Sequence, residues 1–317
     1  MPFSISIIIP AYNVAQFIET AIVSALQQPE VSEVIVVDDS SSDNTLQIIK
    51  ALQVFNAKIK IYHHENHINK GRSATRNLGI KNVSADYIAF LDADDFYLPN
   101  RFSNDKKVFQ QDAKCDGVYN AVGFHFYRTL NPLEEGTFKL NTISQKIKPE
   151  ALFDAVISSK FGYLHLDGLT VKRSVFDKIG YFNESLPVAE DSDIIYKMAL
   201  KCCLESGIIN VPLAKRGIHE TNIFNQEGIY KIYKIKLYES IISWSCENSI
   251  SMQHIDSTLN WLWVFKFREK NNLITDTLYW ASIFFTNPKL LFTYLSVKYF
   301  PIIRQRQILF PFLYPKN

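Results

Sequence analysis

Two clusters of aspartates, each placed directly after a short apolar run, are the residues of this chain best suited to chemistry. The first is Asp38-Asp39 and the second is Asp92-Ala-Asp94-Asp95. One residue separates Asp92 from Asp94, so their carboxylates can point to the same side of an extended chain. Hard divalent cations bind one or two carboxylates together with phosphate oxygens of a substrate. The spacing therefore predicts a Mn²⁺ or Mg²⁺ site that receives a phosphorylated substrate.

Glycine-rich phosphate loops are absent from the sequence. The chain contains neither G-x-G-x-x-G nor G-x-x-x-x-G-K-[ST], the turns that present backbone N–H groups and a helix N-terminus to phosphate. Carboxylates repel phosphate unless a cation lies between them. We therefore expect a metal, and not one of these loops, to meet the negative charge of the substrate.

Four short apolar runs in the N-terminal third predict the strands that position these aspartates. They are Ile5–Ile9, Val34–Val37, Ile59–Tyr62 and Tyr87–Leu91. They are rich in β-branched and aromatic residues without alternation, which is typical of parallel strands buried on both faces. Helical patterns lie between them, which indicates βαβ units and a doubly wound sheet. Ligands of such sheets bind at the carboxyl ends of the strands, where the aspartates lie.

The helical patterns between the runs carry start signals of their own. Apolar residues from Phe17 to Leu26 fall on one helical face, and Asn13 and Gln16 are placed as a capping pair before it. Two further helical patterns follow Asp43 and Gly71. We therefore expect helices to flank the sheet between successive strands.

Four motifs follow one another at the ends of these predicted strands. They are Ser-Ile-Ile-Ile-Pro-Ala-Tyr-Asn (6–13), Val-Ile-Val-Val-Asp-Asp-Ser-Ser-Ser-Asp-Asn-Thr (34–45), Asn-Lys-Gly-Arg-Ser-Ala-Thr-Arg-Asn-Leu-Gly (69–79) and Tyr-Ile-Ala-Phe-Leu-Asp-Ala-Asp-Asp (87–95). In order and spacing they resemble glycosyltransferase family 2. The resemblance implies an α/β GT-A fold, with a doubly wound, mostly parallel sheet flanked by helices. It also implies nucleotide-sugar donors and inversion at the anomeric centre.

The resemblance implies a nucleotide-binding set contributed by these motifs: Pro10, Ala11, Tyr12, Asp39, Lys70, Arg72 and Asp92. Within this set Asp39 matches the residue that accepts a hydrogen bond from the imide of uracil. Lys70 and Arg72 match cationic contacts of the diphosphate, whereas Arg76 is open between a contact and a structural role. Capping of the following helices is the alternative for Asp38 and Asp39.

Three residues are implied as metal ligands, with Mn²⁺ or Mg²⁺ as the cofactor: Asp94, Asp92 and His219. Asp94 is expected to bind the metal directly, and Asp92 to lie near the ribose or the water shell of the metal. His219 belongs to Lys215–Asn222, which resembles the closing loop of the family, and a surface or packed histidine is the alternative. His63, His64 and His67 match no functional position and are expected in a loop.

A second block of the sequence, Val171–Glu184 followed by Val188–Asp193, resembles the acceptor side of the same family. Asp191 matches the catalytic base, and Glu190 is its acceptor-side neighbour. An inverting transfer is a single in-line displacement, so one carboxylate suffices to take the proton of the acceptor hydroxyl. An acidic first helical turn is the alternative for both residues. Ser192 stands where many family members carry an aromatic residue, which leaves the acceptor wall open.

The resemblance covers about residues 4–220 and fades beyond them. We therefore expect a catalytic domain over 1–220, with a nucleotide-binding half at 1–100 and an acceptor-side half at 101–220. A helical, aromatic-rich C-terminal extension is expected over 221–317. Apolar periodicity predicts two helices in it, around 229–244 and 255–267. A third is expected to start at Asn287-Pro288, because proline is favoured at the first helical position.

Charge is unevenly distributed between these parts. No acidic residue follows Asp276, and five basic residues do: Lys289, Lys298, Arg304, Arg306 and Lys316. A basic, aromatic-rich segment is typical of contact with a membrane surface. A helical lid on the catalytic domain or on a second subunit is the alternative. The chain has no run of about 18 apolar residues, so a spanning helix is not expected.

Composition and cysteine usage bound the compartment. With 47% hydrophobic and 21% charged residues the chain is not a disordered protein, and its N-terminus lacks the features of a signal peptide. The four cysteines have no metal-ligand spacing, and Cys202 and Cys203 are expected to pack in a helix without a bridge. We expect a cytoplasmic protein, peripheral at the cytoplasmic face of the inner membrane. A net charge of +2 and the lack of a DNA or RNA motif exclude a nucleic-acid partner.

These features predict a metal-dependent inverting glycosyltransferase that takes a sugar from a UDP-sugar. Its acceptor is expected to be a hydroxyl of a lipid-linked glycan in cell-surface polysaccharide or glycoconjugate synthesis. A nucleotidyltransferase is one alternative, but it would carry a glycine-rich basic loop after the first strand, where this chain has Pro10–Asn13. A catalytically silent GT-A protein that binds a glycan or a partner is another. The presence of Asp39, Asp92, Asp94 and Asp191 argues against it.

Overall fold

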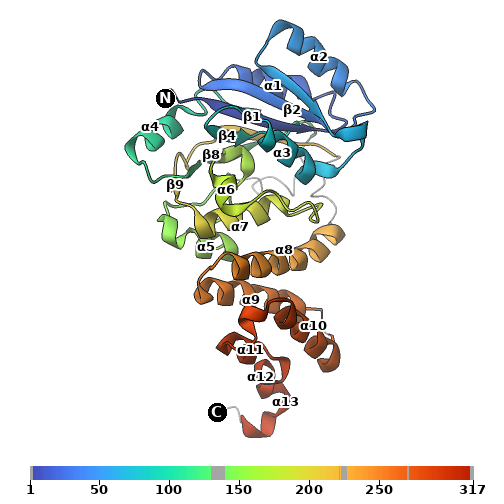
Figure 1. Ribbon diagram of the computed structural model, residues 1–317, viewed down its shortest axis with the longest axis vertical. Coiled ribbons are helices and arrows are strands. Elements are labelled where there is room, and N and C mark those ends of the chain that lie inside the picture. The colour runs from blue at the N-terminus through green and yellow to red at the C-terminus, as the bar shows by residue number, and fades with distance from the viewer. Residues whose placement is uncertain (1–2, 130–139, 221, 223–226, 270, 315–317) are drawn as a thin grey trace. The chain divides into compact units, whose positions relative to one another are not determined.

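The computed structural model of the protein describes residues 3–129, 140–220, 222, 227–269 and 271–314 (Figure 1). The chain divides into two units, Met1–Glu227 and Gly228–Asn317. The first contains all the strands of the described residues, and the second is helical. Thr221 at the expected domain boundary, and Pro315 and Lys316 of the tail, lie outside the described residues.

A seven-stranded sheet forms the centre of the first unit, in the order β3-β2-β1-β4-β8-β6-β9. Its strands are β1 (Ile5–Ala11), β2 (Val31–Asp38), β3 (Ile59–His63), β4 (Tyr87–Phe90), β6 (Gly117–Tyr119), β8 (Leu169–Lys172) and β9 (Leu204–Ser206). β1 pairs in parallel with β2 and β4, and β2 with β3, whereas β8 runs antiparallel to β4 and β6. The predicted doubly wound, mostly parallel sheet is confirmed.

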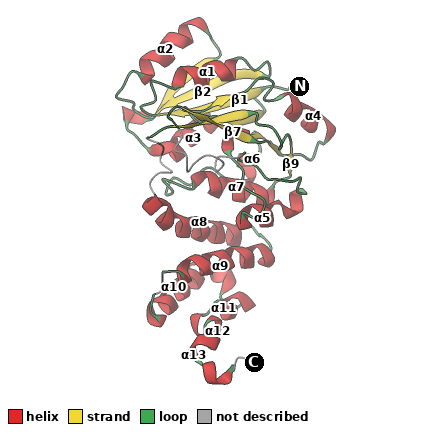
Figure 2. Cartoon of the chain, turned by 180° about the vertical axis from the view of Figure 1, so that it is seen from behind, coloured by secondary structure: helices red, strands yellow, loops and turns green. Residues whose placement is uncertain are grey.

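Seven helices among the described residues of the first unit surround this sheet. They are α1 (Ile18–Leu26), α2 (Thr45–Phe55), α3 (Gly71–Lys81), α4 (Ser103–Gln111), α5 (Pro149–Ser158), α6 (Val175–Ile179) and α7 (Glu190–Lys201). α1 and α2 lie on one face of β1 and β2, and α3 lies on the other (Figure 2). A Cβ on Gly79 would come within 2.5 Å of Ile8 Cγ2, so this glycine allows α3 to approach β1 closely.

The start of α1 differs from the sequence prediction. The helix begins at Ile18 without a side-chain cap, and Asn13 has a φ of +52°. The Asn13 side chain instead accepts a hydrogen bond from the backbone N–H of Ser42 at 2.8 Å. The prediction that Asn13 caps this helix is wrong, because its amide already joins the turn after β1 to the loop after β2.

A smaller sheet of three strands lies beside the carboxyl end of β4. Its strands are β5 (Phe96–Tyr97), β7 (Val122–Phe126) and β10 (Ala214–Ile218), in the order β5-β10-β7. β10 pairs antiparallel with β5 and parallel with β7. Because β5 follows Asp95 directly and β10 precedes His219, this sheet brings the segment after β10 to the aspartates after β4.

The C-terminal part consists of six α-helices among the described residues. They are α8 (Glu227–Glu247), α9 (Met252–Phe267), α10 (Leu273–Thr286), α11 (Tyr294–Lys298), α12 (Pro301–Arg304) and α13 (Arg306–Leu309). Trp280 is buried, with its ring centroid 5.2 Å from that of Trp263 and 5.6 Å from that of Tyr299. These three aromatic rings join α9, α10 and the turn after α11 into one core.

Two sequence predictions about this part fail. No long helix starts at Asn287-Pro288, where the structure has a single 3₁₀ turn, Pro288–Leu290. Asn287 Nδ2 donates to the carbonyl of Ile283 at 2.8 Å, so this residue closes α10 and does not cap a new helix. The helix α10 itself was not predicted. No helix in the described ranges has both the length and the hydropathy needed to cross a bilayer.

The four cysteines are free, so the expectation that Cys202 and Cys203 do not form a bridge agrees with the structure. Their place is different from the expected one, because α7 ends at Lys201 and both cysteines follow it. Cys202 is buried, and burial raises the pKa of its thiol to about 12. A thiol with this pKa is inert at neutral pH.

Candidate active site

The turns after β1 and β2 are held against each other. The backbone N–H of Asp39 donates to the carbonyl of Ala11 at 2.8 Å. Ala11 is buried, whereas half of the surface of Tyr12 is exposed. The structure therefore brings together four residues of the expected nucleotide-binding set, Pro10, Ala11, Tyr12 and Asp39, at the carboxyl ends of two adjacent parallel strands.

The Asp39 carboxylate anchors the loop that leads into α3. Oδ1 accepts from the backbone N–H of Lys70 at 2.7 Å, and Oδ2 accepts from that of Gly71 at 2.8 Å. Gly71 has a φ of +81°, which favours glycine there. A carboxylate oxygen has two lone-pair sites, so Asp39 keeps acceptor capacity for a ligand. The aspartate predicted to contact the base thus also positions Lys70, whose side chain is exposed.

His64 lies beside this carboxylate, with Nε2 at 3.6 Å from Asp39 Oδ1. Burial lowers the pKa of His64, and the nearby charge of Asp39 opposes this only in part. The imidazole is therefore neutral at pH 7. No signal in the sequence distinguished this buried histidine from its neighbours His63 and His67.

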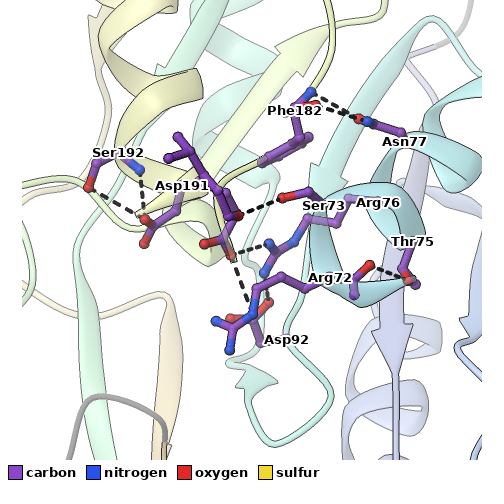
Figure 3. Close-up of polar contacts among 12 residues, drawn as sticks. Arg72, Ser73, Thr75, Arg76, Asn77, Asp92, Phe182, Asp191 and Ser192 are labelled. Carbon is purple, nitrogen blue, oxygen red and sulfur yellow. Dashed lines mark hydrogen bonds and ion pairs between the residues drawn. The ribbon is translucent and has the colours of Figure 1, made fainter. Parts of the chain in front are cut away.

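Arg76 forms the centre of the site and is almost completely buried (Figure 3). Its Nη2 donates to Asp92 Oδ1 at 2.6 Å, and its Nη1 donates to Glu190 Oε1 at 2.8 Å. The same oxygen of Glu190 lies 3.6 Å from Nε of Arg72, one turn earlier on α3. One guanidinium thus links the carboxyl end of β4 to the first turn of α7.

The pKa values of this cluster follow from the shared guanidinium. Burial alone would raise the pKa of Asp92, but the positive charge of Arg76 outweighs it and holds the pKa below the usual range. Asp92 and Glu190 together raise the pKa of Arg76 against the effect of its burial. At Glu190 burial and the neighbouring Asp191 prevail over the two arginines, and the pKa is raised.

Asp191 occupies the second position of α7, next to Glu190. The helix is entered through Ala189, which has a φ of +64°. Asp191 Oδ1 accepts from the backbone N–H of Ser192 at 2.6 Å and from its hydroxyl at 3.4 Å (Figure 3). In the described part of the chain no hydrogen bond reaches Oδ2. Glu190 therefore turns inward to the arginines, while Asp191 is partly exposed with one carboxylate oxygen available.

Helix α3 also fixes the segment that leads to Asp191. Asn77 Nδ2 donates to the carbonyl of Phe182 at 3.0 Å, and Asn77 Oδ1 accepts from its N–H at 2.9 Å (Figure 3). The Ser73 hydroxyl donates to the carbonyl of Leu186 at 3.3 Å. One helix thus carries the side chains that hold both the donor-side carboxylate Asp92 and the segment before Asp191.

Asp94 faces a different partner from Asp92. Its Oδ2 lies 2.8 Å from His219 Nε2 and accepts from Asn222 Nδ2 at 3.2 Å. The His219 ring stacks on Phe17, with ring centroids 4.8 Å apart. The predicted metal ligands Asp94 and His219 are therefore adjacent. Asp92 Oδ1, by contrast, is held by Arg76.

Beneath these groups lies a buried cluster of Asp95, His165 and Asp167. Asp95 Oδ1 accepts from the N–H of Gly217 at 2.7 Å, and His165 Nδ1 is 3.4 Å from Asp167 Oδ2. Burial and the neighbouring carboxylates, Asp167 foremost, hold the pKa of Asp95 well above its usual range. Burial lowers the pKa of His165, but Asp167 outweighs it and the net shift is upward.

The donor set was compared with the needs of a divalent cation. Asp94 and His219 offer a carboxylate and an imidazole in direct contact, and Asp92 retains its second oxygen. Ligand atoms of Asp92, Asp95 and His165 also lie within 4.8 Å of one another. Carboxylate oxygens suit Mg²⁺ and Mn²⁺, and several carboxylates lie close together. The residues present therefore fit such an ion.

Several residues of the site were not predicted. The sequence analysis left the role of Arg76 open and did not mention His165 or Asp167. It quoted Asn222 only as the end of a loop. The Arg76–Glu190 contact joins residues 114 positions apart, and no spacing rule in a single sequence reveals it. The only available signal was the position of Arg76 one turn after Arg72.

Comparison with protein families and with related chains gives a consistent result. The family model described as "Glycosyl transferase family 2" matches residues 6–179, more than half of the chain. A glycosyltransferase of Rickettsia felis is 32% identical over 202 residues, covering 61% of this chain and 31% of that protein. The succinoglycan biosynthesis protein ExoU of Rhizobium meliloti is 29% identical over 211 residues, covering 63% of this chain and 57% of that protein.

Solved structures show the same architecture. Residues 1–349 of S. aureus TarS in complex with UDP-GlcNAc align with a TM-score of 0.62 and 18% identity, covering 84% of this chain and 73% of that one. The mannosyltransferase PcManGT from Pyrobaculum calidifontis, in complex with GDP-Man and Mn²⁺, aligns with a TM-score of 0.53 and 15% identity, covering 97% and 87%. At these identities the likeness concerns the fold. The chain spans about a third of the length of the R. felis relative.

Proposed function

The chain belongs to glycosyl transferase family 2, and we propose that it is a metal-dependent, inverting glycosyltransferase acting on a nucleotide sugar, preferably a UDP-sugar. The observation that carries this proposal is the shared guanidinium of Arg76, which binds Asp92 on the donor side and Glu190 beside Asp191. A nucleotide-binding edge and a candidate base are thereby held on one frame, as a transfer from donor to acceptor requires.

The donor is proposed to bind at the carboxyl ends of β1 and β2. The half-exposed ring of Tyr12 offers an apolar surface for the base, and Asp39 has acceptor capacity for an N–H of the base. Lys70 and Arg72, presented by the loop that Asp39 anchors, would meet the diphosphate. The positive charge of these two side chains opposes the repulsion from the carboxylates after β4.

The metal site is proposed to consist of Asp94 and His219, with Asp92 contributing from its free oxygen. A divalent cation bound there would offset the negative charge of the diphosphate when it leaves. The chain itself orients these ligands, because Asn222 fixes the Asp94 carboxylate and Phe17 supports the His219 ring.

Asp191 is proposed as the base that takes the proton of the acceptor hydroxyl. In an in-line displacement the base lies on the face opposite the leaving diphosphate. Ser192 holds Oδ1, and the proton would go to Oδ2. Glu190 was expected on the acceptor side. Its burial against Arg76 supports a different role for it, the positioning of the first turn of α7.

The acceptor is proposed to be a lipid-linked glycan in cell-surface polysaccharide or glycoconjugate synthesis, reached from the cytoplasmic face of the inner membrane. Two observations support this. The ExoU relative is named for the biosynthesis of a polysaccharide, succinoglycan, and the C-terminal segment after Asp276 lacks acidic residues. A membrane surface would bring the enzyme and such an acceptor together.

The direct test is nucleotide release from a panel of UDP- and GDP-sugars, with and without Mn²⁺, followed by glycan analysis of the product. We expect Mn²⁺-dependent release of UDP. In parallel, UDP with Mn²⁺ should raise the melting temperature of the protein. If no nucleoside diphosphate changes the melting temperature, the chain is a catalytically silent member of the fold.

A further inference from the structure

Helix α10 is apolar on two opposite faces. Trp280, Ile283 and Phe284 are buried on the inner face. On the outer face Ile274, Leu278 and Phe285 have exposed fractions of 74%, 68% and 71%. At roughly 100° per residue these three residues fall within an arc of about 40°, so they form one stripe along the helix, here called the outer stripe. An ordinary surface helix has a single apolar face.

The inner face accounts for the packing of α10 within its own unit. Trp280 stacks on Tyr299, and α10 contacts α12. The outer stripe takes no part in this core. Further large apolar side chains are exposed in the residues that follow α10, with Phe292 fully exposed and Phe312 at 77%. Large exposed apolar side chains that gather in one part of a chain mark an interaction surface.

The charge of the same segment indicates what covers this surface. Asp276, its last acidic residue, is buried and accepts from Gln305 Nε2 at 3.4 Å. Lys289, Arg304 and Arg306 donate to neutral oxygens, of Cys246, Asn260 and Ile303, and so keep their net charge. Of the described basic residues after Asp276, only Lys298 forms an ion pair, with Asp256. The surface is therefore apolar and positively charged.

We propose that the outer stripe of α10 inserts into the headgroup region of an anionic lipid bilayer. A helix of 14 residues is about 21 Å long, shorter than the roughly 30 Å of a hydrocarbon core, so it would lie in the plane of the interface. Apolar burial of the stripe and attraction of the basic side chains to anionic lipid act together there. The stripe by itself offers three side chains of roughly 150 Å² each, well below the about 800 Å² per partner of a standard protein interface.

This inference deepens the proposed membrane-linked acceptor and changes the residues responsible. The sequence placed membrane contact in the basic tail after Asp276, whereas the structure assigns its apolar part to a helix that begins at Leu273. Because the stripe is solvent-exposed, its residues can be replaced without opening the core of the unit.

The test is binding of the full chain to vesicles of phosphatidylglycerol and phosphatidylcholine, compared with phosphatidylcholine alone. The variant combines Ile274→Gln, Leu278→Gln and Phe285→Gln. The matched control combines Val54→Gln and Phe55→Gln, which remove two apolar side chains exposed by 80% and 89% on α2. We expect the wild-type chain and the control to bind anionic vesicles, and the stripe variant to bind at least tenfold more weakly, since each methylene lost from the interface changes partitioning about fourfold.

Each outcome has a distinct meaning. Equal vesicle binding by the wild-type chain and the stripe variant, or no binding by any of them, overturns the proposal. A wild-type dimer in size-exclusion chromatography that the stripe variant converts to a monomer, without vesicle binding, assigns the stripe to a second copy. Thermal stabilisation by UDP and Mn²⁺ is measured on the same samples. Its loss in all of them contradicts the proposed catalytic function and leaves the membrane result independent.

Discussion

The unit Met1–Glu227 and the unit Gly228–Asn317 use their polar and apolar residues in opposite ways. The first buries charge: Arg76, Glu190 and Asp95 are each almost completely covered. The second leaves apolar side chains in solvent, with Phe292 fully exposed. Burial of a charge costs free energy unless it is paired, and exposure of an apolar surface costs free energy unless a partner covers it. Each unit therefore departs from the general rule where it would meet its ligand.

The difference also shows how each ligand is recognised. In the first unit hydrogen bonds of 2.6 to 2.8 Å between Arg76 and its two carboxylates fix the directions of side chains, which a reaction with defined geometry requires. In the second unit the exposed residues have no such directional partners. An apolar stripe binds any apolar medium in proportion to the area that it buries.

The largest expected effect tests the chemistry of the first unit. Replacing Asp191 with Asn removes the base and keeps the size of the side chain. We expect kcat to fall by about 10³- to 10⁴-fold, the upper range for general base catalysis, with donor binding retained. Nucleotide release measures the first quantity, and thermal stabilisation by UDP and Mn²⁺ measures the second. Asp177→Asn, at an exposed position of α6, is the control. Unchanged turnover in Asp191→Asn would sink the assignment of the base.

The second prediction concerns the stability of the first unit. Arg76→Met leaves Asp92 and Glu190 without their shared partner, so we expect a loss of about 3–5 kcal/mol in the free energy of unfolding. Arg76→Lys should fall between the two, because a single ammonium cannot reproduce the fork that contacts both carboxylates. Urea unfolding followed by circular dichroism measures the effect. Arg173→Met, at an exposed position, should change little. An equally small change in Arg76→Met would show that the buried pair is not a structural link.

The success of the sequence analysis differs between the two units for physical reasons. The strands of the first unit and the meeting of Asp94 with His219 follow from residue types at the ends of buried strands, where topology dictates proximity. The Arg76–Glu190 contact depends on the packing of α3 against α7, which no local pattern encodes. Asn13 was read as a cap because its side chain suits one, but the loop after β2 competes for the same oxygen.

In the second unit the same methods miss a whole helix. Residues Leu273–Thr286 are apolar on two faces, so the single-face periodicity that identifies an amphipathic helix is weak there. Asn287 and Pro288 have the residue types of a helix start, yet Asn287 closes the preceding helix through the carbonyl of Ile283. The residues that misled the prediction are thus those that complete α10.

The third prediction moves to the core of the second unit. Trp280 is buried between Trp263 and Tyr299, so Trp280→Ala should cost about 3 kcal/mol or more through the cavity that it leaves. Phe292→Ala is the matched control in the same unit, and at this fully exposed position we expect less than about 0.5 kcal/mol. Nucleotide-dependent stabilisation, which reports on the first unit, should persist in both variants. A cost at Phe292 similar to that at Trp280 would mean that Phe292 is covered in solution.

The fourth prediction separates the units by pH. Glu33 on β2 is buried, which alone would raise its pKa, but hydrogen bonds from Lys60, Ser6 and Ser84 lower the pKa from 4.5 to about 2. A group with a lowered folded-state pKa contributes stability that is present above pH 4.5 and is lost as pH falls toward 2. We expect Glu33 to account for about 2–3 kcal/mol of acid destabilisation.

The comparison of Glu33→Gln with the wild-type chain between pH 6 and pH 2.5 measures this contribution. The variant should be less stable at pH 6 and should lose less stability on acidification, so the two curves converge at low pH. Parallel curves would contradict the role of Glu33. Trp280→Ala serves as the control, because its cost has no titrating group behind it and should be the same at both ends of the range.

The smallest expected effect concerns Ser192, where this sequence departs from the aromatic residue of many family members. Its hydroxyl reaches Asp191 Oδ1 at 3.4 Å, whereas its backbone N–H reaches the same oxygen at 2.6 Å. Ser192→Ala removes only the longer bond, so we expect kcat to change by less than about threefold, within the net value of one weak hydrogen bond. The pH dependence of kcat should not shift, because the N–H that orients the base remains. A loss above tenfold with a shifted pH profile would show that the hydroxyl itself orients the base. Directional control would then extend to the rim of the acceptor site, and the contrast with the non-directional surface of the second unit would be sharper still.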